Sequence, residues 1–228
     1  YSEDLDFLVS DSLKLGVIAD AVRARLEGTM WTPADMTLSV TKARDAHNPH
    51  AFDVALSGPN VIGSVRVKVE LWKTPATVLH EIKIRVAPVR IPRGQVAGLQ
   101  TFAPTADLSE IYADKVFALG ARPYLKPRDV FDLYWLKSQH DIGGLSHDAM
   151  RVRLAIYPNE TPEGWIERAQ ARRAELATSD KVSKDLKRWL PSFWPLDEMT
   201  AKRMCDTAIT ELDRGIELML ELVNHPKP

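Results

Sequence analysis

Two aspartates stand two residues apart in the opening segment YSEDLDFLVSD, inside an otherwise apolar run. In an extended strand, residues i and i+2 project from the same face, so we expect Asp4 and Asp6 to lie side by side. Two carboxylates held that close repel each other unless a positive charge sits between them. Spacing alone favours an amphipathic strand with its acids in water, and a metal-binding pair is the functional alternative.

A second group of charged residues lies in EIYADKVFALGARPYLKPRDVFDLYWL. Lys115 and Arg122 are seven residues apart, so they share one face of a helix that runs that far. Asp129 and Asp132 are spaced i and i+3 on one side of the next helix, where Arg128 can reach Asp132 at i+4. Taken alone, these residues favour a surface ion pair and an acid that complements the helix dipole.

Together the two groups have the parts of a phosphoryl-transfer site. Carboxylates hold divalent metals that bridge phosphate oxygens, and cations neutralise the charge that develops on the phosphates. Magnesium prefers one or two carboxylates plus substrate oxygens over a closed protein cage. The pair formed by Asp4 and Asp6 supplies that arrangement.

The N-terminal half must position the acid pair. Helical spacing of apolar residues predicts a helix in DSLKLGVIADAVRARLEG, with Asp11 or Ser12 as its cap and Gly28 after its end. From Thr37 to Val86 the period changes to two, which predicts consecutive strands in TLSVTKA, AFDVALSG, GSVRVKVELW and HEIKIRVAP. The sheet is expected to have one apolar face for helices and one charged face carrying Arg66, Lys68, Glu70, Glu81, Lys83 and Arg85.

The C-terminal half reads as helical from Leu108 onward. Helices are predicted in SEIYADKVFALGAR, with Ser109 as cap, and in PRDVFDLYWLKSQ, SHDAMRVRLAIY, TPEGWIERAQARRAEL and LDEMTAKRMCDTAITELDRGIELMLELV. The fold class is therefore α+β. We expect an α/β domain over residues 1–106 and a helical domain over residues 107–228.

Composition excludes several classes of protein. The 228 residues have a net charge of −1, so overall charge does not indicate a nucleic-acid partner. The single cysteine, Cys205, excludes an internal disulfide and a cysteine-built metal site, and fits a reducing compartment. No apolar run approaches the length that spans a bilayer, and no signal-peptide pattern is present, so a cytoplasmic protein without a membrane partner is expected.

The segments YSEDLDF and LSEIYADKVFALGARPYLKPRDVFDLYWL together resemble the AbiEii/AbiGii nucleotidyltransferase-toxin family, whose members act in type IV toxin–antitoxin and abortive-infection systems. That family shows a Gly-Gly-Ser/Thr opening, Arg-x-Ser-x-Asp-x-Asp-Phe, then Ala-Asp-Lys, Ala-Leu, Arg and Arg-Asp-x-x-Asp-Leu. The resemblance spans at least residues 1–136. The matching residues are Ser2, Asp4, Asp6, Phe7, Ala113, Asp114, Lys115, Ala118, Leu119, Arg122, Arg128, Asp129, Asp132 and Leu133.

The resemblance implies a minimal nucleotidyltransferase fold, with a mixed sheet and helices on one face, followed by a helical domain. It implies that Asp4 and Asp6 bind Mg²⁺ and that Ser2 lies beside the triphosphate or is itself modified. Lys115 would contact NTP phosphates, and Asp129 would be catalytic or would orient the substrate. The supporting residues it implies are Arg122, Arg128 and Asp132, with Arg122 and Arg128 also binding nucleotide.

Two parts of the family's site are not fixed by motifs. Nucleotidyltransferases carry a third carboxylate on a later strand, for which Glu70 is our choice and Glu81 the competitor. The glycine-rich element and the arginine that precede the acid pair are expected upstream of Tyr1. A protein that truly began at Tyr1 would be expected to bind nucleotide poorly.

The remaining notable residues favour structural roles. His47 and His50 indicate a turn rather than a metal site, and Cys205 indicates a buried thiol. Trp189 and Trp194 favour packing at a helix junction, with stacking on an RNA base as the alternative. A basic run favours a solvated helix face, with a tRNA backbone as the alternative ligand: Arg168, Arg172, Arg173, Lys181, Lys184, Lys187 and Arg188.

The function predicted is magnesium-dependent transfer of a nucleoside monophosphate from an NTP to an acceptor, with release of pyrophosphate. The resemblance makes the 3′ end of tRNA the favoured acceptor and a cognate antitoxin an expected partner. The alternatives are a non-catalytic binding partner in a toxin–antitoxin complex, and transfer to a protein or small molecule.

Overall fold

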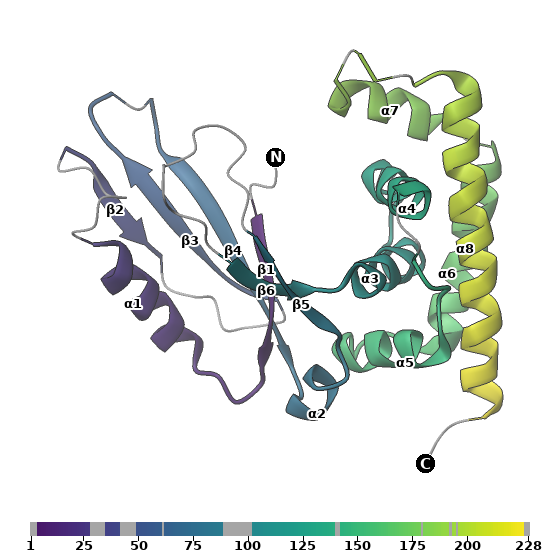
Figure 1. Ribbon diagram of the computed structural model, residues 1–228, viewed down its shortest axis with the longest axis horizontal. Helices are drawn as coiled ribbons and strands as arrows, with labels where there is room; N and C mark the ends of the chain where they lie inside the picture. The colour runs from purple at the N-terminus through teal and green to yellow at the C-terminus, as the bar shows by residue number, and fades with distance from the viewer. Residues whose placement is uncertain are drawn as a thin grey trace. The chain divides into compact units, whose positions relative to one another are not determined.

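A computed structural model describes residues 4–27, 35–41, 49–60, 62–88, 102–139, 142–178, 180–191, 193–194 and 196–225, without the side chains of residues 4 and 139. The chain forms two compact units, residues 1–81 and 82–228. Strands make up most of the first unit and helices most of the second, which confirms the α+β class (Figure 1).

The first unit contains a four-stranded mixed sheet in the order β1-β4-β3-β2. The strands are β1 (Asp4–Ser10), β2 (Thr37–Val40), β3 (His50–Ser57) and β4 (Val65–Thr74). β1 runs parallel to β4, whereas β3 is antiparallel to both β4 and β2. The helices of this unit are α1 (Leu15–Leu26) and the short α2 (Ala76–Leu79).

A small core lies between α1 and the apolar face of this sheet. It consists of Leu15, Ala19, Val40, Phe52, Val69 and Leu71. The register pairs Leu5 with Val69 and Phe7 with Leu71, so the predicted apolar face of β1 is confirmed. Leu5 and Phe7 nevertheless remain 48% and 47% exposed, because β1 is at the edge of this sheet.

The predicted cap of α1 is wrong. The helix begins at Leu15 after Lys14, and no side chain caps it. The Ser12 hydroxyl is instead hydrogen-bonded to the Ser10 hydroxyl at 2.8 Å. Asp11 and Ser12 therefore belong to the turn that leaves β1, because a Ser or Asp caps a helix only when its oxygen reaches the N–H groups of the first turn.

The second unit begins with a hairpin of β5 (Ile84–Pro88) and β6 (Phe102–Ala106). The segment HEIKIRVAP was expected in the main sheet, and that prediction is wrong: among the strands that the structure describes, β5 pairs with β6 in a separate two-stranded sheet. Ile84 and Val86 are each 71% exposed. Period-two alternation correctly indicated a strand, but a two-stranded hairpin by itself has no second layer to cover its apolar face.

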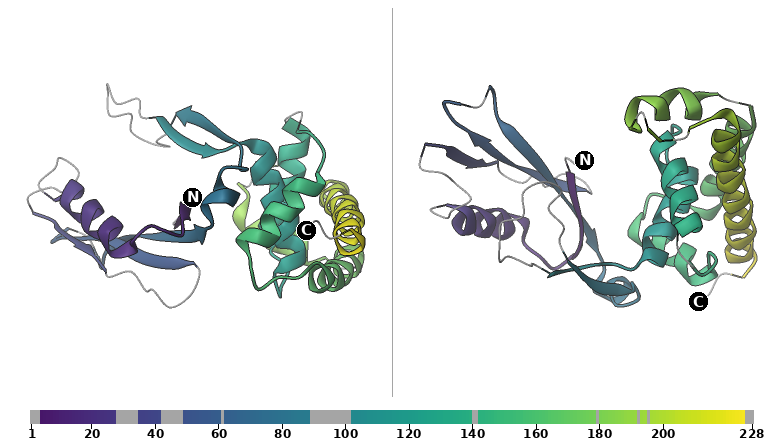
Figure 2. Two further views of the ribbon diagram at one scale, coloured as in Figure 1. Left: turned by 90° about the horizontal axis from the view of Figure 1, so that it is seen from below. Right: turned by 45° about the horizontal axis from the view of Figure 1, so that its top comes forward.

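In the described residues after the hairpin, the helices are α3 (Leu108–Ala121), α4 (Pro127–Gln139), α5 (His147–Ile156), α6 (Pro162–Thr178), α7 (Lys181–Trp189) and α8 (Glu198–Asn224). The long α8 packs against α4 and α6, and α6 packs against α3 (Figure 2). Trp165 of α6 is fully buried among them, and its indole N–H donates to the Phe117 carbonyl at 2.8 Å. Gly120 and Gly215 border the indole so closely that a Cβ at either position would overlap it.

The cap of α3 also differs from the prediction. Asp107, not Ser109, precedes the helix, and its carboxylate accepts hydrogen bonds from the Ser109 N–H at 3.0 Å and the Ser109 hydroxyl at 2.9 Å. The division after residue 81 groups the β5–β6 hairpin with the helices, whereas the boundary expected at 106–107 follows that hairpin. The assignment of separate roles to residues 1–106 and 107–228 stays a prediction.

None of the described helices is both long and apolar enough to cross a bilayer.

Candidate functional site

The acid pair of β1 lies beside a charged stretch of β4. In the parallel register Asp4 is opposite Lys68 and Asp6 is opposite Glu70. Residues opposite each other on neighbouring strands project from the same face, so Asp6 and Glu70 are adjacent side chains on the polar face of the sheet. We call the positions Asp4, Asp6, Lys68 and Glu70 the carboxylate face.

A cation already accompanies these acids. The Lys68 ammonium donates to the Glu70 carboxylate, and both side chains are solvent-accessible. Asp53 of β3 is opposite Lys68 and adds a further carboxylate on the same side of the sheet, where Arg66 lies 4.0 Å from it. Sequence reasoning passed over Asp53. Asp53 could have been found from its position in the period-two alternation of AFDVALS.

The donor chemistry of the carboxylate face suits a hard divalent cation. Asp6 and Glu70 offer carboxylate oxygens, and magnesium takes one or two carboxylates while keeping sites for water and substrate oxygens. Within the described side chains, which do not include that of Asp4, no three His, Cys, Asp or Glu residues converge as a metal site.

Four other residues named in the predictions lie away from this face or outside the described chain. Glu81 lies in the turn after α2 rather than on a strand. Ser2 and His47 are outside the described residues. His50, which was paired with His47 in the prediction of a turn, instead begins β3 opposite Leu71.

In the second unit, the predicted charged residues of α3 and α4 converge. The Lys115 ammonium lies 2.9 Å from Asp129 Oδ1 and 2.6 Å from Asp132 Oδ2. The Arg122 guanidinium binds Asp129 Oδ2, so both oxygens of this carboxylate are engaged. We call Lys115, Arg122, Asp129 and Asp132 the Asp129 cluster. Asp129 is only 1% exposed, whereas the Asp132 side chain is 38% exposed.

Local sequence explains why the Asp129 cluster forms. α3 ends at Ala121, which leaves Arg122 at its cap, and Pro127 starts α4 so that Asp129 falls in the first turn. Arg172 of α6 fixes this junction by donating to the Leu119 carbonyl at 3.2 Å and the Arg122 carbonyl at 3.0 Å. Arg172 is buried, so the prediction that it belongs to a solvated basic face is wrong.

Positive charge exceeds negative charge around the cluster. Burial alone would lower the pKa of Lys115, but Asp129 and Asp132 overcome that effect and raise it, so Lys115 stays protonated. The pKa of nearby Lys126 is lowered by partial burial and by the positive charges of Arg122, Arg128 and Lys115. A bound anion such as phosphate would relieve this repulsion.

Arg128 does not form the pair that was predicted for it. Asp132 pairs with Lys115, and the Arg128 guanidinium instead lies 4.6 Å from the ring centroid of Trp189 on α7. The i, i+4 spacing allowed the contact with Asp132, but that carboxylate is taken by the half-buried ammonium of Lys115, and Arg128 lies against the exposed indole instead.

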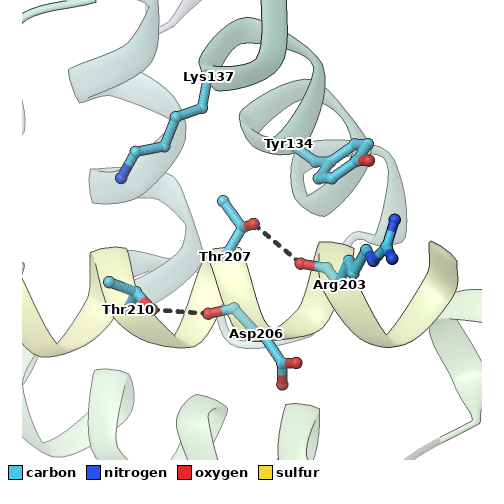
Figure 3. A pocket seen from close by; sticks show the side chains of 6 residues that line it. All are labelled: Tyr134, Lys137, Arg203, Asp206, Thr207 and Thr210. Carbon is cyan, nitrogen blue, oxygen red and sulfur yellow. Dashed lines mark hydrogen bonds between the residues drawn. The ribbon is translucent and has the colours of Figure 1, made fainter. Parts of the chain in front are cut away.

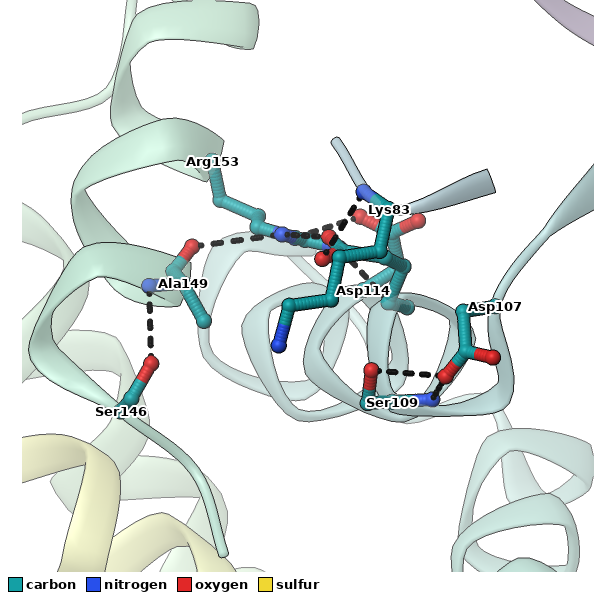
Figure 4. Close-up of polar contacts among 8 residues, drawn as sticks. Lys83, Asp107, Ser109, Asp114, Ser146, Ala149 and Arg153 are labelled. Carbon is teal, nitrogen blue, oxygen red and sulfur yellow. Dashed lines mark hydrogen bonds and ion pairs between the residues drawn. The ribbon is translucent and has the colours of Figure 1, made fainter. Parts of the chain in front are cut away.

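A buried arginine that sequence reasoning missed stabilises the outer side of α3. Arg153 of α5 is 1% exposed and donates to the Glu110 carboxylate at 2.7 Å, the Glu110 carbonyl at 2.6 Å and Asp114 Oδ1 at 2.9 Å (Figure 4). Glu110 also accepts from the Lys83 backbone N–H at 3.4 Å. Asp114 of the Ala-Asp-Lys match therefore pairs with α5, while the next residue, Lys115, pairs with α4. Burial raises the pKa of Asp114 against the opposing charge of Arg153.

A shallow groove of about 410 Å³ lies between α4 and α8 (Figure 3). Its polar groups are largely used within the protein. The hydroxyls of Thr207 and Thr210 donate to carbonyls one turn earlier on α8, and the Lys137 ammonium binds the buried Glu211.

Several structural predictions are confirmed. Cys205 is a buried thiol whose pKa is raised by burial. The Trp194 ring packs edge-on against Phe131, with centroids 5.5 Å apart. The same packing was predicted for Trp189, and there the prediction is wrong, because Trp189 is 59% exposed. Most residues of the basic run are paired with acids. The pairs are Arg168 with Glu160, Arg173 with Asp213, Lys181 with Glu175, Lys184 with Asp180 and Arg188 with Asp185.

Comparison with known proteins gives one family match. The family model described as "Nucleotidyl transferase AbiEii toxin, Type IV TA system" matches residues 1–199. No curated protein matches the chain by sequence. Solved structures similar to this chain include two crystal structures of Helicobacter pylori proteins. JHP933 has a TM-score of 0.44 and 13% identity over 98% of this chain and 79% of that one. The other, described as a candidate nucleotidyltransferase, has a TM-score of 0.45 and 15% identity over 99% of this chain and 82% of that one.

Proposed function

Because the chain belongs to the AbiEii nucleotidyltransferase toxin family of type IV toxin–antitoxin systems, we propose that it transfers a nucleoside monophosphate from an NTP to the 3′ end of tRNA in the cytoplasm. Membership makes the protein a transferase that uses an NTP and has a cognate antitoxin. Mg²⁺ as the metal and tRNA as the acceptor are the proposed refinements.

The carboxylate face is the proposed metal site. Asp4 and Asp6 would hold Mg²⁺, with Glu70 as the third carboxylate. When bound, the metal polarises the α-phosphate and neutralises charge on the departing pyrophosphate. The observation that best supports this assignment is the β1–β4 register, which sets Asp6 directly beside Glu70. Glu81 is the weaker candidate because it is in a turn.

The Asp129 cluster is the proposed phosphate-binding element. Lys115 and Arg122 would contact the NTP phosphates, Arg128 would add charge, and Ser2 would lie beside the triphosphate. Asp129 is buried with both oxygens bound, so we assign it to orienting Lys115 and Arg122 rather than to proton transfer. Asp132 supports it by holding the exposed side of Lys115.

The test is incubation of the protein with Mg²⁺, each labelled NTP and total tRNA. Asp6→Asn should abolish label transfer, because the amide removes a negative metal ligand while keeping the shape of the side chain. Asp20→Asn is the matched control, since Asp20 is an exposed acid on α1 and should retain full activity. Equal transfer by the wild type and Asp6→Asn would contradict the metal assignment. Label on protein or a small molecule rather than on tRNA would contradict the proposed acceptor.

A further inference from the structure

The C-terminal end of α3 is held by two arginines of α6. Arg168 donates from Nε to the Gly120 carbonyl at 3.3 Å. Arg172 donates to the Leu119 carbonyl at 3.2 Å and to the Arg122 carbonyl at 3.0 Å. The last carbonyls of a helix have no partners within it, and a cation complements the negative end of the helix dipole. These contacts therefore fix the point at which the chain leaves α3.

All three guanidinium nitrogens of Arg172 are engaged within the protein. Nε and Nη2 donate to the two carbonyls, and Nη1 donates to the Glu175 carboxylate. The residue is only 7% exposed, so it does not offer its guanidinium to a substrate. A planar guanidinium can bridge two carbonyls, whereas a lysine ammonium presents a single point charge. Apart from its charge, Arg172 can therefore affect a ligand only through the groups that it holds.

Arg122, which Arg172 holds by its carbonyl, belongs to the Asp129 cluster. The Arg122 backbone N–H donates to the Ala118 carbonyl at 3.0 Å, so both polar backbone groups of this residue are bound. From this fixed backbone the guanidinium reaches Asp129 on α4. The Arg122 side chain is 35% exposed, which leaves part of it open to an anion. The direction of the Arg122 side chain thus depends on a backbone that Arg172 fixes.

We propose that Arg172 is a positioning residue for phosphate binding: by holding the Arg122 carbonyl, it keeps the Arg122 guanidinium where it meets both Asp129 and a phosphate of the NTP. The proposal rests on the proposed function, which assigns the NTP phosphates to the Asp129 cluster. A displaced binding group loses much of its contribution, because hydrogen bonds to an anion depend on distance and direction. Arg172 should therefore affect phosphate affinity only while Arg122 is present.

Calorimetric titration of the full chain with inorganic tripolyphosphate in Mg²⁺ measures this effect without catalysis, because tripolyphosphate is the part that all NTPs share. Arg172→Lys should weaken binding about tenfold, since the charge is kept but the bridge between the two carbonyls is lost. In an Arg122→Gln background the same substitution should cause no further weakening. Arg173→Lys is the matched control, because Arg173 is the next residue, pairs with Asp213 at the surface and should leave the affinity unchanged.

A second variant, Glu175→Ala, keeps the arginine and tests the proposal if Arg172→Lys fails to fold. The Glu175 side chain is 31% exposed and binds Arg172 Nη1. Its loss should loosen Arg172 and weaken tripolyphosphate binding about twofold. Removing a negative charge would by itself strengthen the binding of an anion, so the two effects have opposite signs. Equal or stronger binding by Glu175→Ala would overturn the inference.

The outcomes separate this inference from the proposed function. Equal affinity of the wild type and Arg172→Lys, or equal weakening with and without Arg122, would assign Arg172 to the packing of α3 on α6 and overturn the inference even if NMP transfer occurs. Coupling between Arg172 and Arg122 without NMP transfer to any acceptor would support the inference and contradict the proposed function. Absence of tripolyphosphate binding by the wild type would contradict the phosphate-binding role of the Asp129 cluster, and with it the inference.

Discussion

At the scale of single residues, Asp129 is the centre of the proposed phosphate-binding element. It is a buried carboxylate whose two oxygens are shared between Lys115 and Arg122. Because it is buried with both oxygens bound, such a residue does not reach substrate easily, but it fixes two cations in a defined geometry. Asp132 shares Lys115 yet is partly exposed, so the two acids of Arg-Asp-x-x-Asp lie in different environments.

We predict that Asp129→Ala destabilises the protein by about 3 kcal/mol, because it leaves Lys115 and Arg122 without their buried partner next to Lys126. Asp132→Ala should cost less than about 1 kcal/mol, since its carboxylate is partly solvated. Denaturant unfolding of both variants measures the difference. Equal losses of unfolding free energy in the two variants would contradict the prediction that the buried acid contributes more to stability than the partly exposed one.

The sequence predicted these contacts only in part. Helical spacing indicated that Lys115 and Arg122 share a face and that Asp129 and Asp132 share another, and both sets meet in the structure. The pairing of Arg128 with Asp132 was wrong because spacing on one helix does not reveal a competing indole on another. Arg153 was missed for the same reason, since its partners on α3 are about forty positions earlier in the chain.

At the scale of elements, three helices approach one another closely around Trp165. Gly120 on α3 and Gly215 on α8 provide the space for the indole. We predict that Gly215→Ala destabilises the helical unit by about 1–3 kcal/mol, because the new Cβ would lie 2.6 Å from the ring and force α6 and α8 apart. Gly144→Ala is the matched control, as nothing lies within 4 Å of its Cβ position. Thermal unfolding compares the two variants, and a similar melting temperature for both would show that α8 shifts at little cost.

The contact between α3 and α5 should depend on pH. The pKa of Asp114 is raised above its ordinary value by burial, so stability decreases as pH rises from that ordinary value through the raised one. Arg153→Gln removes the opposing positive charge and should raise this pKa further. The variant should therefore lose more stability at neutral pH than at pH about 4, which unfolding at both pH values would measure. A loss that is independent of pH would assign the contribution of Arg153 to packing alone.

Element prediction failed where burial depends on partners outside the segment. The alternation in HEIKIRVAP indicated a strand correctly, yet β5 pairs with β6 and not with the main sheet. Period-two patterning reports which side chains share a face and carries no information about the neighbouring strand. The parallel pairing of β1 with β4, which brings Asp6 beside Glu70, was likewise beyond the reach of the sequence pattern, although Glu70 was chosen from its charged face.

At the scale of the whole molecule, the two units differ in how much of their surface they bury. Among the described residues, the sheet unit has a small core between α1 and one face of the sheet, whereas the helical unit has a much larger buried cluster that includes Trp165 and Leu212. Because stability follows buried apolar area, opening of the sheet unit should cost less free energy than opening of the helices.

We predict that amide hydrogen exchange is faster in β1–β4 than in α3, α6 and α8, and that Mg²⁺ with NTP slows exchange in β1 and β4. Ligand that binds a locally folded state stabilises it by mass action, so protection should increase at the carboxylate face. Mass spectrometry of deuterium uptake with and without Mg²⁺ and NTP measures both effects. In Asp6→Asn, ligand should no longer slow exchange in β1 and β4, whereas the slow exchange of the helices should be retained. Uniform exchange across both units would contradict the difference in core size, and unchanged uptake in β1 and β4 would contradict metal and nucleotide binding at the sheet.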